Sequence, residues 1–334
     1  MKRNYRSSSR GAQILQFVAL ALIVVCVVSA GILLLDAWDK GQGQYEEQNP
    51  GSLQSSLEYN GTEYVLRDNL ETMLILGLDT YETPELDSYN NTMQADFLLL
   101  VVVDNANSSY SVLQINRDTM VEMSVLGVAG NPIDTVTGQI ALAHTYGNGK
   151  EVSCRNVAEA VSDLLMHINV DHYVSATMST VSVYNDHIGG VEVEVLDDFT
   201  GIDDTLIKGQ KVLLTGEQAL RYVRARQGME DSTNIKRMAR QRQYLKALYE
   251  KTKLTADGDS QFAANAFTAV AENIVTDCSA TRLQTMIDKV LSYEFKGIVE
   301  LEGSSVAGET MMEFYPTQDS ILQAVTSLFY TPKP

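Results

Sequence analysis

The sequence predicts an α/β fold: an α/β sandwich with a mixed central sheet, preceded by one transmembrane helix. Three observations predict it. One apolar run of 22 residues lies near the amino terminus, short runs rich in Leu and Val follow after residue 70, and amphipathic segments with helical spacing occur between residues 153 and 329. Continuous Leu/Val runs are typical of strands that are buried on both faces, so helices are expected on both sides of the sheet.

The long apolar run, residues 14–35, is the predicted membrane anchor. As a helix it would span about 33 Å, enough to cross the hydrocarbon core of a bilayer. Basic residues and no acid precede it, and Asp36 and Asp39 follow it. The positive-inside rule then predicts a single-pass protein of the cell membrane with a cytoplasmic amino terminus and an extracellular bulk. A cleaved signal peptide is the alternative, but the run continues past the small residues at 28–30, which favours an uncleaved anchor.

Composition sets the expected organisation of the rest. Hydrophobic residues make up 45% of the chain and the net charge is −18, which favours a folded domain and argues against a nucleic-acid partner. Cys154 and Cys278 are far apart in sequence, which leaves open whether they pair. The expected parts are a cytoplasmic tail at 1–13, the anchor at 14–35, a juxtamembrane spacer at 36–70, a catalytic domain at 71–251 and a helical part at 252–334 packed on the same domain.

The expected elements follow from local patterns, in chain order. Apolar runs predict strands at 72–77, 96–104 and 110–116, and alternation predicts a strand with one solvated face at 191–195. Ser153 is a candidate N-cap for a helix that follows it, and Thr215 to Gln218 fits a capping box. Further helices are expected at 235–251, 261–275, 281–291 and 320–329.

Acidic residues are expected to meet at one edge of the sheet. A turn at 105–109 makes the second and third strands a hairpin, and pairing Asp104 with Tyr110 places Asp96 opposite Asp118, about 5 Å away. Asp79 follows the first strand and would reach the same edge. Facing carboxylates repel each other unless a cation or an arginine, here Arg117, lies between them. Such oxygen ligands suit Mg²⁺, although aspartates at strand ends are also common in turns and caps.

Cations cluster later in this acidic chain. Arginine forks fit phosphate oxygens, so the cluster is a candidate phosphate site. A solvated helix face with salt bridges is the alternative for any one of these residues. On a helix, Arg237, Arg240 and Gln241 would share one face. Between residues 221 and 242 the cations are Arg221, Arg224, Arg226, Lys236, Arg237, Arg240 and Arg242.

These segments resemble the LytR-CpsA-Psr family of cell-envelope glycopolymer transferases. The resemblance covers roughly residues 71–251, and the order and spacing of the shared pieces make it specific. The pieces are MLILGLD (73–79), QADFLLLVV (94–102), LQINRDT (113–119), IGGVEVEV (188–195), the run from GQ to LTGEQALRYVRAR (209–226) and RMARQRQYL (237–245).

The resemblance implies an α/β/α sandwich with an apolar pocket for a polyprenyl-pyrophosphate lipid. It implies a phosphotransferase that moves a glycopolymer phosphate from that carrier to a peptidoglycan hydroxyl during cell wall assembly. Asp79 and Asp96 match metal ligands, for Mg²⁺ or Mn²⁺. Asp118 would act as a base or orient Arg117, the other expected catalytic residue. The expected pyrophosphate-binding residues are Arg117, Arg224, Arg226, Arg237, Arg240 and Gln241.

Three positions depart from the family pattern: Gln94, Gln139 and Asn234 stand where the family usually has Arg, Lys and Asp. Two cations and one acid are therefore missing, which keeps open a non-catalytic protein that only binds polyprenyl pyrophosphate. A transcriptional regulator is a further alternative. The acidic composition, the short segment before the apolar run and the lack of a helix-turn-helix pattern argue against it.

Overall fold

The computed structural model of the chain describes residues 55–78, 91–225, 262–309 and 311–333, with 240, 243–244, 246–248, 250–252 and 254–255. These residues form two compact units. The sheet unit comprises described residues up to 177 with 274–279 and 288–333, and the helical unit comprises those of 178–273 with 280–287. Within the described part of the chain, no helix is long and apolar enough to cross a membrane. The predicted anchor at 14–35 lies outside the described residues.

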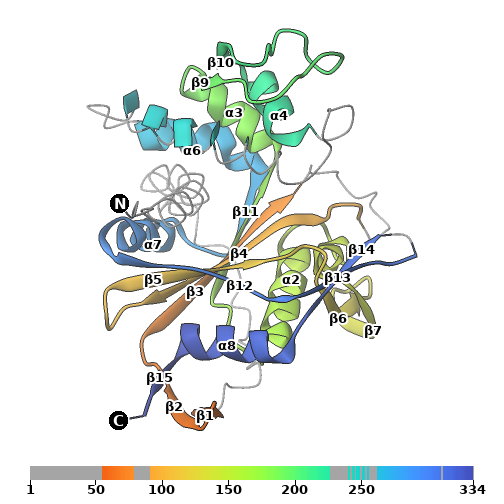
Figure 1. The fold of residues 1–334 in the computed structure, drawn as a ribbon, viewed down its shortest axis with the longest axis vertical. Helices are drawn as coiled ribbons and strands as arrows, with labels where there is room; N and C mark the ends of the chain where they lie inside the picture. The colour runs from red at the N-terminus through yellow and green to blue at the C-terminus, as the bar shows by residue number, and fades with distance from the viewer. Residues whose placement is uncertain are drawn as a thin grey trace, which may run out of the picture. The chain divides into compact units, whose positions relative to one another are not determined.

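A six-stranded mixed sheet forms the centre of the sheet unit (Figure 1). Its order is β11-β8-β3-β4-β5-β12, with β8 parallel to β3, β12 parallel to β5 and the other neighbours antiparallel. The mixed sheet of the predicted fold class is confirmed, and the three predicted Leu/Val strands lie at its centre. The strands are β3 (Leu70–Leu78), β4 (Ala95–Asp104), β5 (Ser109–Ile115), β8 (His172–Thr177), β11 (Ile274–Thr276) and β12 (Glu294–Glu300).

Both faces of this sheet are buried. On one face, alternate residues such as Leu74 and Leu100 form a core with α2 (Glu151–Leu164) and α8 (Gln318–Phe329). On the opposite face Met73, Val101 and Val112 are also fully buried. This explains why the strands read as continuous apolar runs instead of alternating ones. The helix near Ser153 is α2, but its N-cap is Lys150, and Ser153 is buried within its first turn.

The register of the β4–β5 hairpin differs by one residue from the expected one. Asp104 pairs with Ser109, not with Tyr110. The loop is shorter than expected because the carboxylate of Asp104 accepts hydrogen bonds from both the backbone and the side chain of Asn107. Continuing this register places Asp96 opposite Arg117, so an arginine faces the aspartate where the sequence suggested a second carboxylate.

Three smaller sheets complete the sheet unit. The segment expected as a spacer, 36–70, already carries strands from residue 56 onwards, and the segment after 252, expected to be helical, carries strands as well as helices. Most of these strands form local hairpins with many exposed residues, so they lack the continuous apolar runs that identified the central strands. The sheets are β1 (Ser56–Tyr59), β2 (Thr62–Leu66) and β15 (Tyr330–Pro332); β6 (Met120–Leu126) and β7 (Pro132–Gln139); and β13 (Gly303–Ala307) and β14 (Met312–Pro316).

The helical unit contains a two-stranded sheet and several helices. The predicted capping box opens α4, because Thr215 and Gln218 bond reciprocally. Gly216 lies so close to α3 that an added Cβ would be 2.3 Å from the carbonyl oxygen of Ser182. The described residues between 240 and 255 are helical, as expected. The elements are α3 (Ser179–His187), β9 (Val191–Glu194), β10 (Lys211–Leu214), α4 (Gly216–Arg224), α6 (Phe262–Val270), η3 (Ala271–Asn273) and the start of α7 (Ala280–Ser292).

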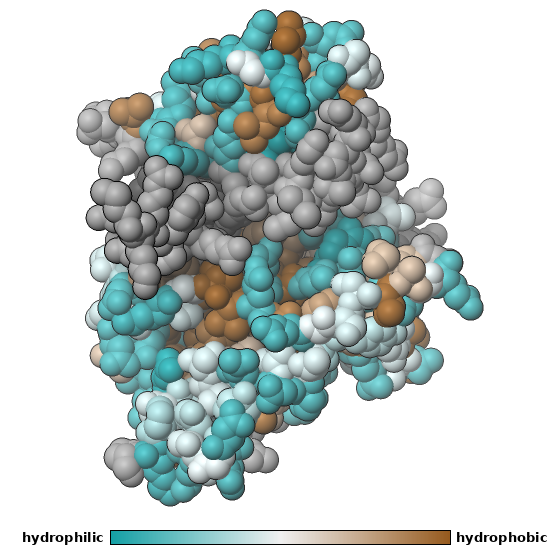
Figure 2. All heavy atoms as spheres, viewed as in Figure 1, coloured by the Kyte–Doolittle hydropathy of each residue, from teal (hydrophilic) through white to brown (hydrophobic). Residues whose placement is uncertain are grey.

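The surface of the described residues is mixed in character. On the face drawn in Figure 2, hydrophilic residues alternate with smaller groups of hydrophobic ones. Among the exposed apolar side chains of the sheet unit, Val128 and Ile133 lie at the β6–β7 hairpin, and Met312 lies on β14. Scattered surface residues of this kind are normal in folded proteins and do not by themselves mark a site.

Candidate active site

The end of β5 carries the first group of predicted site residues. Arg117 follows this strand, and its guanidinium forms an ion pair with Asp96 of β4. Its Nη2 donates a 2.7 Å hydrogen bond to Oε1 of Gln94, and its Nε lies 3.5 Å from Oδ1 of Asp118. The side chains of Arg117, Asp96 and Asp118 are 32%, 44% and 30% exposed. The structure therefore brings three predicted site residues together at a solvent-accessible edge of the sheet.

A β-bulge places Asp96 beside Arg117. Gly77 of β3 pairs with Phe97, whereas the next residue, Leu78, pairs with Ala95, so Asp96 is the extra residue on β4. A bulge bends its strand and changes the direction of the local side chains. Gly77 permits this approach, because an added Cβ would lie 2.9 Å from the Cβ of Phe97. The glycine of the MLILGLD segment thus supports the geometry of the site.

The guanidinium of Arg117 keeps two carboxylates near each other despite their repulsion. A guanidinium carries five N–H donors. Its two hydrogen bonds, to Asp96 and Gln94, leave further donors for an incoming anion. Gln94 contributes a neutral acceptor where the family pattern has a cation. The guanidinium of Arg117 can therefore bind a phosphate through two N–H groups at once and stabilise negative charge that develops on that phosphate.

Asp118 is held by a part of the chain that the sequence did not connect with the site. Gln139, which is 3% exposed, donates hydrogen bonds to Oδ1 of Asp118 at 2.7 Å and to the carbonyl oxygen of Met312 at 2.6 Å. The backbone N–H of Phe314 in β14 donates to the carbonyl oxygen of Asp118 at 2.8 Å. Oδ2 of Asp118 accepts no hydrogen bond from any described residue. This oxygen can therefore accept a proton from a hydroxyl group.

Arg240, in the helical unit, has a different environment from the one predicted. Its side chain is 1% exposed, Nη1 lies 2.5 Å from Oδ2 of Asp197, and Nε donates to the carbonyl oxygen of Tyr222 at 2.8 Å. Nη2 donates to the carbonyl oxygen of Ala225, and the guanidinium lies over the ring of Phe199. Because the guanidinium is buried and each of its three nitrogens already has a partner, a phosphate in solvent cannot reach it. Arg240 is a structural residue that fixes the end of α4.

Neighbouring motif residues also serve the fold. Gln243 accepts a 2.5 Å hydrogen bond from the hydroxyl of Tyr222 and donates one to the carbonyl oxygen of Glu194. Burial raises the pKa of Tyr222 to about 12, so this phenol stays a neutral donor. Arg221 pairs with Asp203 at 3.1 Å. The arginine-rich run thus contains structural pairs, the alternative that the sequence left open for single residues.

Five further residues were predicted from the sequence to belong to the site: Arg224 and four others. Arg224 is exposed at the end of α4. The other four lie outside the described residues. They are Asp79, Arg226, Arg237 and Gln241.

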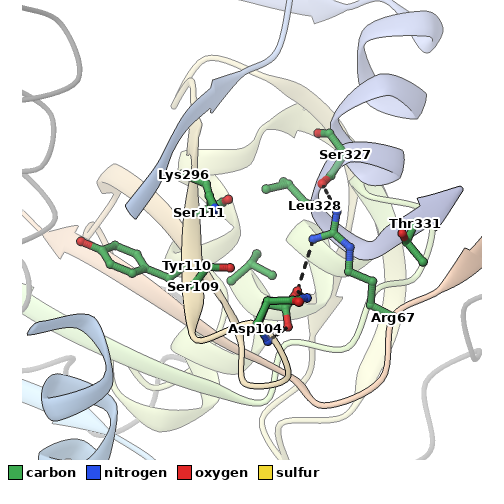
Figure 3. A pocket seen from close by; sticks show the side chains of 11 residues that line it. Arg67, Asp104, Ser109, Tyr110, Ser111, Lys296, Ser327, Leu328 and Thr331 are labelled. Carbon is green, nitrogen blue, oxygen red and sulfur yellow. Dashed lines mark hydrogen bonds and ion pairs between the residues drawn. The ribbon is translucent and has the colours of Figure 1, made fainter. Parts of the chain in front are cut away.

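A cavity of about 460 Å³ lies at the other end of the sheet unit's central strands (Figure 3). It is lined by Asp104 and Ser109, which flank the β4–β5 loop, whereas Asp96 lies at the opposite end of β4, about 25 Å along the strand. Arg67 in its wall is already bonded to Ser327 and Tyr330 and lies 3.7 Å from Asp104. The cavity is therefore separate from the Arg117 group.

The buried thiol of Cys154 has a neighbour within its own unit. Its Sγ lies 3.7 Å from Nε2 of His144, whose Nδ1 lies 2.9 Å from the carbonyl oxygen of Met93. Burial lowers the pKa of His144 to about 4, so the ring is neutral at pH 7. Among the described residues, no disulfide joins Cys154 to Cys278, which answers the question that the sequence left open.

Comparison with known proteins identifies the family of this chain. The teichoic acid transferase TagU of Bacillus mycoides, a polyisoprenyl-teichoic acid–peptidoglycan transferase by name, is 25% identical over 81% of each chain. TagU of Halalkalibacterium halodurans is 27% identical over 77% of each. The crystal structure of B. subtilis TagV has the same fold, with a TM-score of 0.53 and 23% identity over 79% of this chain and 97% of that one. A sequence profile of the LytR_cpsA_psr family matches residues 37–328. The chain therefore belongs to the LytR_cpsA_psr family.

Proposed function

We propose that the protein is a membrane-anchored, extracellular phosphotransferase of cell wall assembly. It moves a glycopolymer phosphate from a polyprenyl pyrophosphate carrier to peptidoglycan. The observation that carries the proposal is the solvent-accessible group of Arg117, Asp96 and Asp118. Family membership and the names of the curated relatives, which are teichoic acid transferases, support the reaction class.

In the proposed step, an acceptor hydroxyl attacks the phosphorus that carries the glycopolymer. A new P–O bond forms, the P–O bond to the prenyl phosphate breaks, and prenyl phosphate leaves. The hydroxyl proton passes to Oδ2 of Asp118, while Arg117 stabilises the charge that grows on the leaving phosphate. Gln139 keeps Asp118 in place through its hydrogen bond to Oδ1. Arg224, Arg226, Arg237 and Gln241 are the further proposed contacts to the pyrophosphate.

A divalent cation fits the chemistry of this donor set. Asp96 and Asp118 offer only carboxylate oxygens at the Arg117 edge, and both are partly exposed. Oxygen-only sites with one or two carboxylates suit Mg²⁺, which completes its shell with water and substrate phosphate. We propose Asp96 and Asp79 as its ligands. When bound, Mg²⁺ or Mn²⁺ would neutralise charge on the pyrophosphate.

Reconstituted transfer is the direct test. The full chain in micelles is given a polyprenyl-pyrophosphate glycopolymer and peptidoglycan fragments, and both the linked product and released prenyl phosphate are measured. Asp118→Asn should lower turnover by about 10²-fold or more while leaving lipid binding intact. Arg221→Ala is the control, because it changes a charged residue of another shared segment whose partner Asp203 makes it a structural pair.

A binding protein without turnover is the competing function, favoured by the neutral Gln94 and Gln139 where cations are usual. If the parent chain binds the lipid pyrophosphate but forms neither the linked glycopolymer nor free prenyl phosphate, the protein is a binding protein. Loss of the pH dependence of turnover in Asp118→Asn would identify Asp118 as the base. An unchanged pH profile with a slower rate would assign it to orienting Arg117.

The proposed topology has its own test. Protease added to intact cells should digest the chain beyond residue 35, because the basic residues before the apolar run keep the amino terminus inside. Digestion only after permeabilisation would show that the bulk of the chain lies inside the cell. It would then have no access to peptidoglycan, and the proposed function would be wrong.

A further inference from the structure

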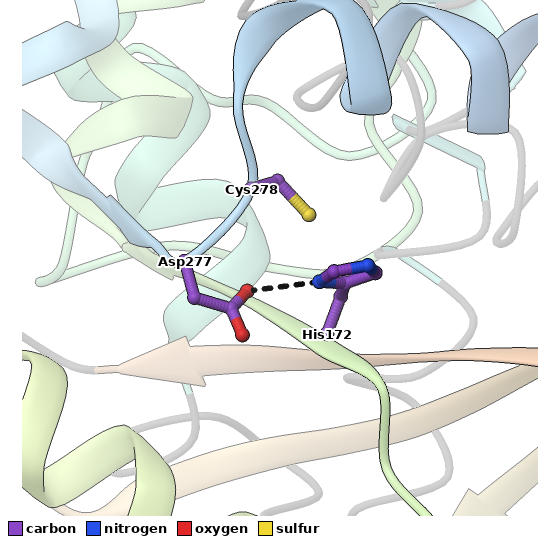
Figure 4. Close-up of side chains that lie close together, drawn as sticks. All are labelled: His172, Asp277 and Cys278. Carbon is purple, nitrogen blue, oxygen red and sulfur yellow. Dashed lines mark ion pairs between the residues drawn. The ribbon is translucent and has the colours of Figure 1, made fainter. Parts of the chain in front are cut away.

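Three side chains with metal-binding atoms meet at one edge of the sheet unit, apart from the Arg117 group. His172 opens β8, and Asp277 and Cys278 follow β11 directly. Because β11 runs antiparallel to β8, with Thr276 opposite Val174, the chain after β11 returns beside the start of β8. A ring nitrogen of His172, a carboxylate oxygen of Asp277 and Sγ of Cys278 all lie within 4.8 Å of one another. Figure 4 shows the three side chains around a common space.

The spacing of these atoms suits a tetrahedral ion. Nδ1 of His172 lies 3.6 Å from Oδ1 of Asp277, which is longer than a hydrogen bond. Zinc bonds nitrogen and oxygen at about 2.0–2.2 Å, so two such ligands of a tetrahedral site lie about 3.4 Å apart. The observed separation is therefore close to that of two ligands of one ion. Small side-chain rotations would bring Sγ of Cys278 to its bonding distance of about 2.3 Å.

Hydrogen bonds from neighbouring backbone and side-chain groups hold these residues in place. The backbone N–H of Tyr173 donates to Oδ1 of Asp277 at 3.0 Å. The hydroxyl of Thr276 donates to the carbonyl oxygen of Tyr173 at 2.7 Å and accepts from the backbone N–H of Cys278 at 3.1 Å. Outer hydrogen bonds of this kind orient the ligands of a metal site. The turn that carries Asp277 and Cys278 is thus fixed against β8 before any ion binds.

We propose that His172, Asp277 and Cys278 bind a transition-metal ion, with Zn²⁺ preferred and water as the fourth ligand. Imidazole and thiolate favour Zn²⁺ over Mg²⁺, so the site is chemically distinct from the oxygen ligands near Arg117. The side chains of His172 and Asp277 are 20% and 35% exposed, which gives an ion access from solvent. Bound metal would join the edge strand β11 to β8 and so raise the stability of the sheet unit.

Cobalt provides the test, because tetrahedral Co²⁺ bound to a thiolate gives a charge-transfer band and intense visible absorption. The reduced full chain in micelles should bind one Co²⁺ with this signature, and Zn²⁺ should displace it. Cys278→Ser should abolish the charge-transfer band. His172→Ala and Asp277→Asn should each weaken Co²⁺ binding by about tenfold or more.

Two control variants match the site residues. Cys154→Ala removes the other described thiol. His167→Gln removes a histidine that pairs with an aspartate, Asp163, at 2.9 Å but belongs to no metal-binding group among the described residues. Both should keep the full cobalt signature. Zn²⁺ should also raise the melting temperature of the parent and of both controls, but not that of Cys278→Ser.

Two results would overturn the proposal. One is the absence of a thiolate–cobalt band in the parent chain at excess Co²⁺. The other is the same band in Cys278→Ser, provided that this variant melts at the temperature of the metal-free parent. Neither readout uses the transfer reaction, so the outcome is independent of the proposed function.

Discussion

Arg117 and Arg240 were both predicted to bind the pyrophosphate, yet their surroundings are opposite. Arg117 is 32% exposed and faces partly exposed acids at the edge of the central sheet. Arg240 is 1% exposed, and its guanidinium is fully engaged by Asp197 and two backbone carbonyls of the helical unit. A guanidinium that is buried with its partners stabilises the fold, whereas one at a solvent-accessible edge can also contact a substrate. Burial, rather than residue type, separates the two roles.

The largest expected effect is on stability, at Arg240. Arg240→Ala would leave Asp197 buried without its partner and would remove two caps from α4, at a cost of about 3–5 kcal/mol. Thermal unfolding of the full chain measures it. Arg221→Ala is the control, since its 46% exposed side chain should contribute about 1 kcal/mol or less. Equal effects of the two substitutions would contradict the structural assignment of Arg240.

Acid should destabilise the sheet unit through His144. Burial lowers its pKa to about 4 in the folded chain, from 6.5, so the unfolded chain binds more protons between these pH values. Stability is therefore complete above pH 6.5 and falls as the pH decreases towards 4, by about 3 kcal/mol.

Melting curves at pH 7 and pH 4.5 measure this effect. His144→Gln should reduce the difference between the two melting temperatures, whereas His167→Gln, at an exposed position, should not. An unchanged difference in His144→Gln would show that other groups cause the acid sensitivity.

A smaller loss is expected at the contact between α3 and α4. Gly216→Ala would place a methyl group 2.3 Å from the carbonyl oxygen of Ser182, so the helices must separate. We expect a destabilisation of about 1–3 kcal/mol. Gly201→Ala is not a clean control because its φ is +81°, so Glu217→Ala, which places an alanine at an exposed position in the first turn of α4, serves better. A Gly216→Ala variant as stable as the parent would mean that α3 and α4 tolerate a larger spacing.

The sequence predicted those features that have a local pattern. The Leu/Val runs identified the three central strands because both of their faces are buried, and Thr215 and Gln218 identified the start of α4 through a capping box. The hairpin register was wrong by one residue because the side chain of Asp104 closes a shorter loop. Sequence patterns do not contain such a side-chain contact.

The site could be predicted only in part. Spacing brought Asp96, Arg117 and Asp118 to one edge, as the structure has them. The hydrogen bond from Phe314 to Asp118 could not be expected, because it comes from a hairpin about 200 residues away in sequence. Arg240 could not be told apart from Arg117 before the burial of its side chain was known.

The most direct test of the account measures stability and turnover of Arg117→Ala together. We expect the melting temperature to change little, since Arg117 is partly exposed and its pairs are at the surface. Transfer to peptidoglycan should fall by about 10²–10³-fold. Arg117→Lys should recover only part of the rate, because lysine keeps the charge but loses the fork. A variant that unfolds easily but transfers at the parent's rate would contradict the assignment of Arg117 to the proposed active site.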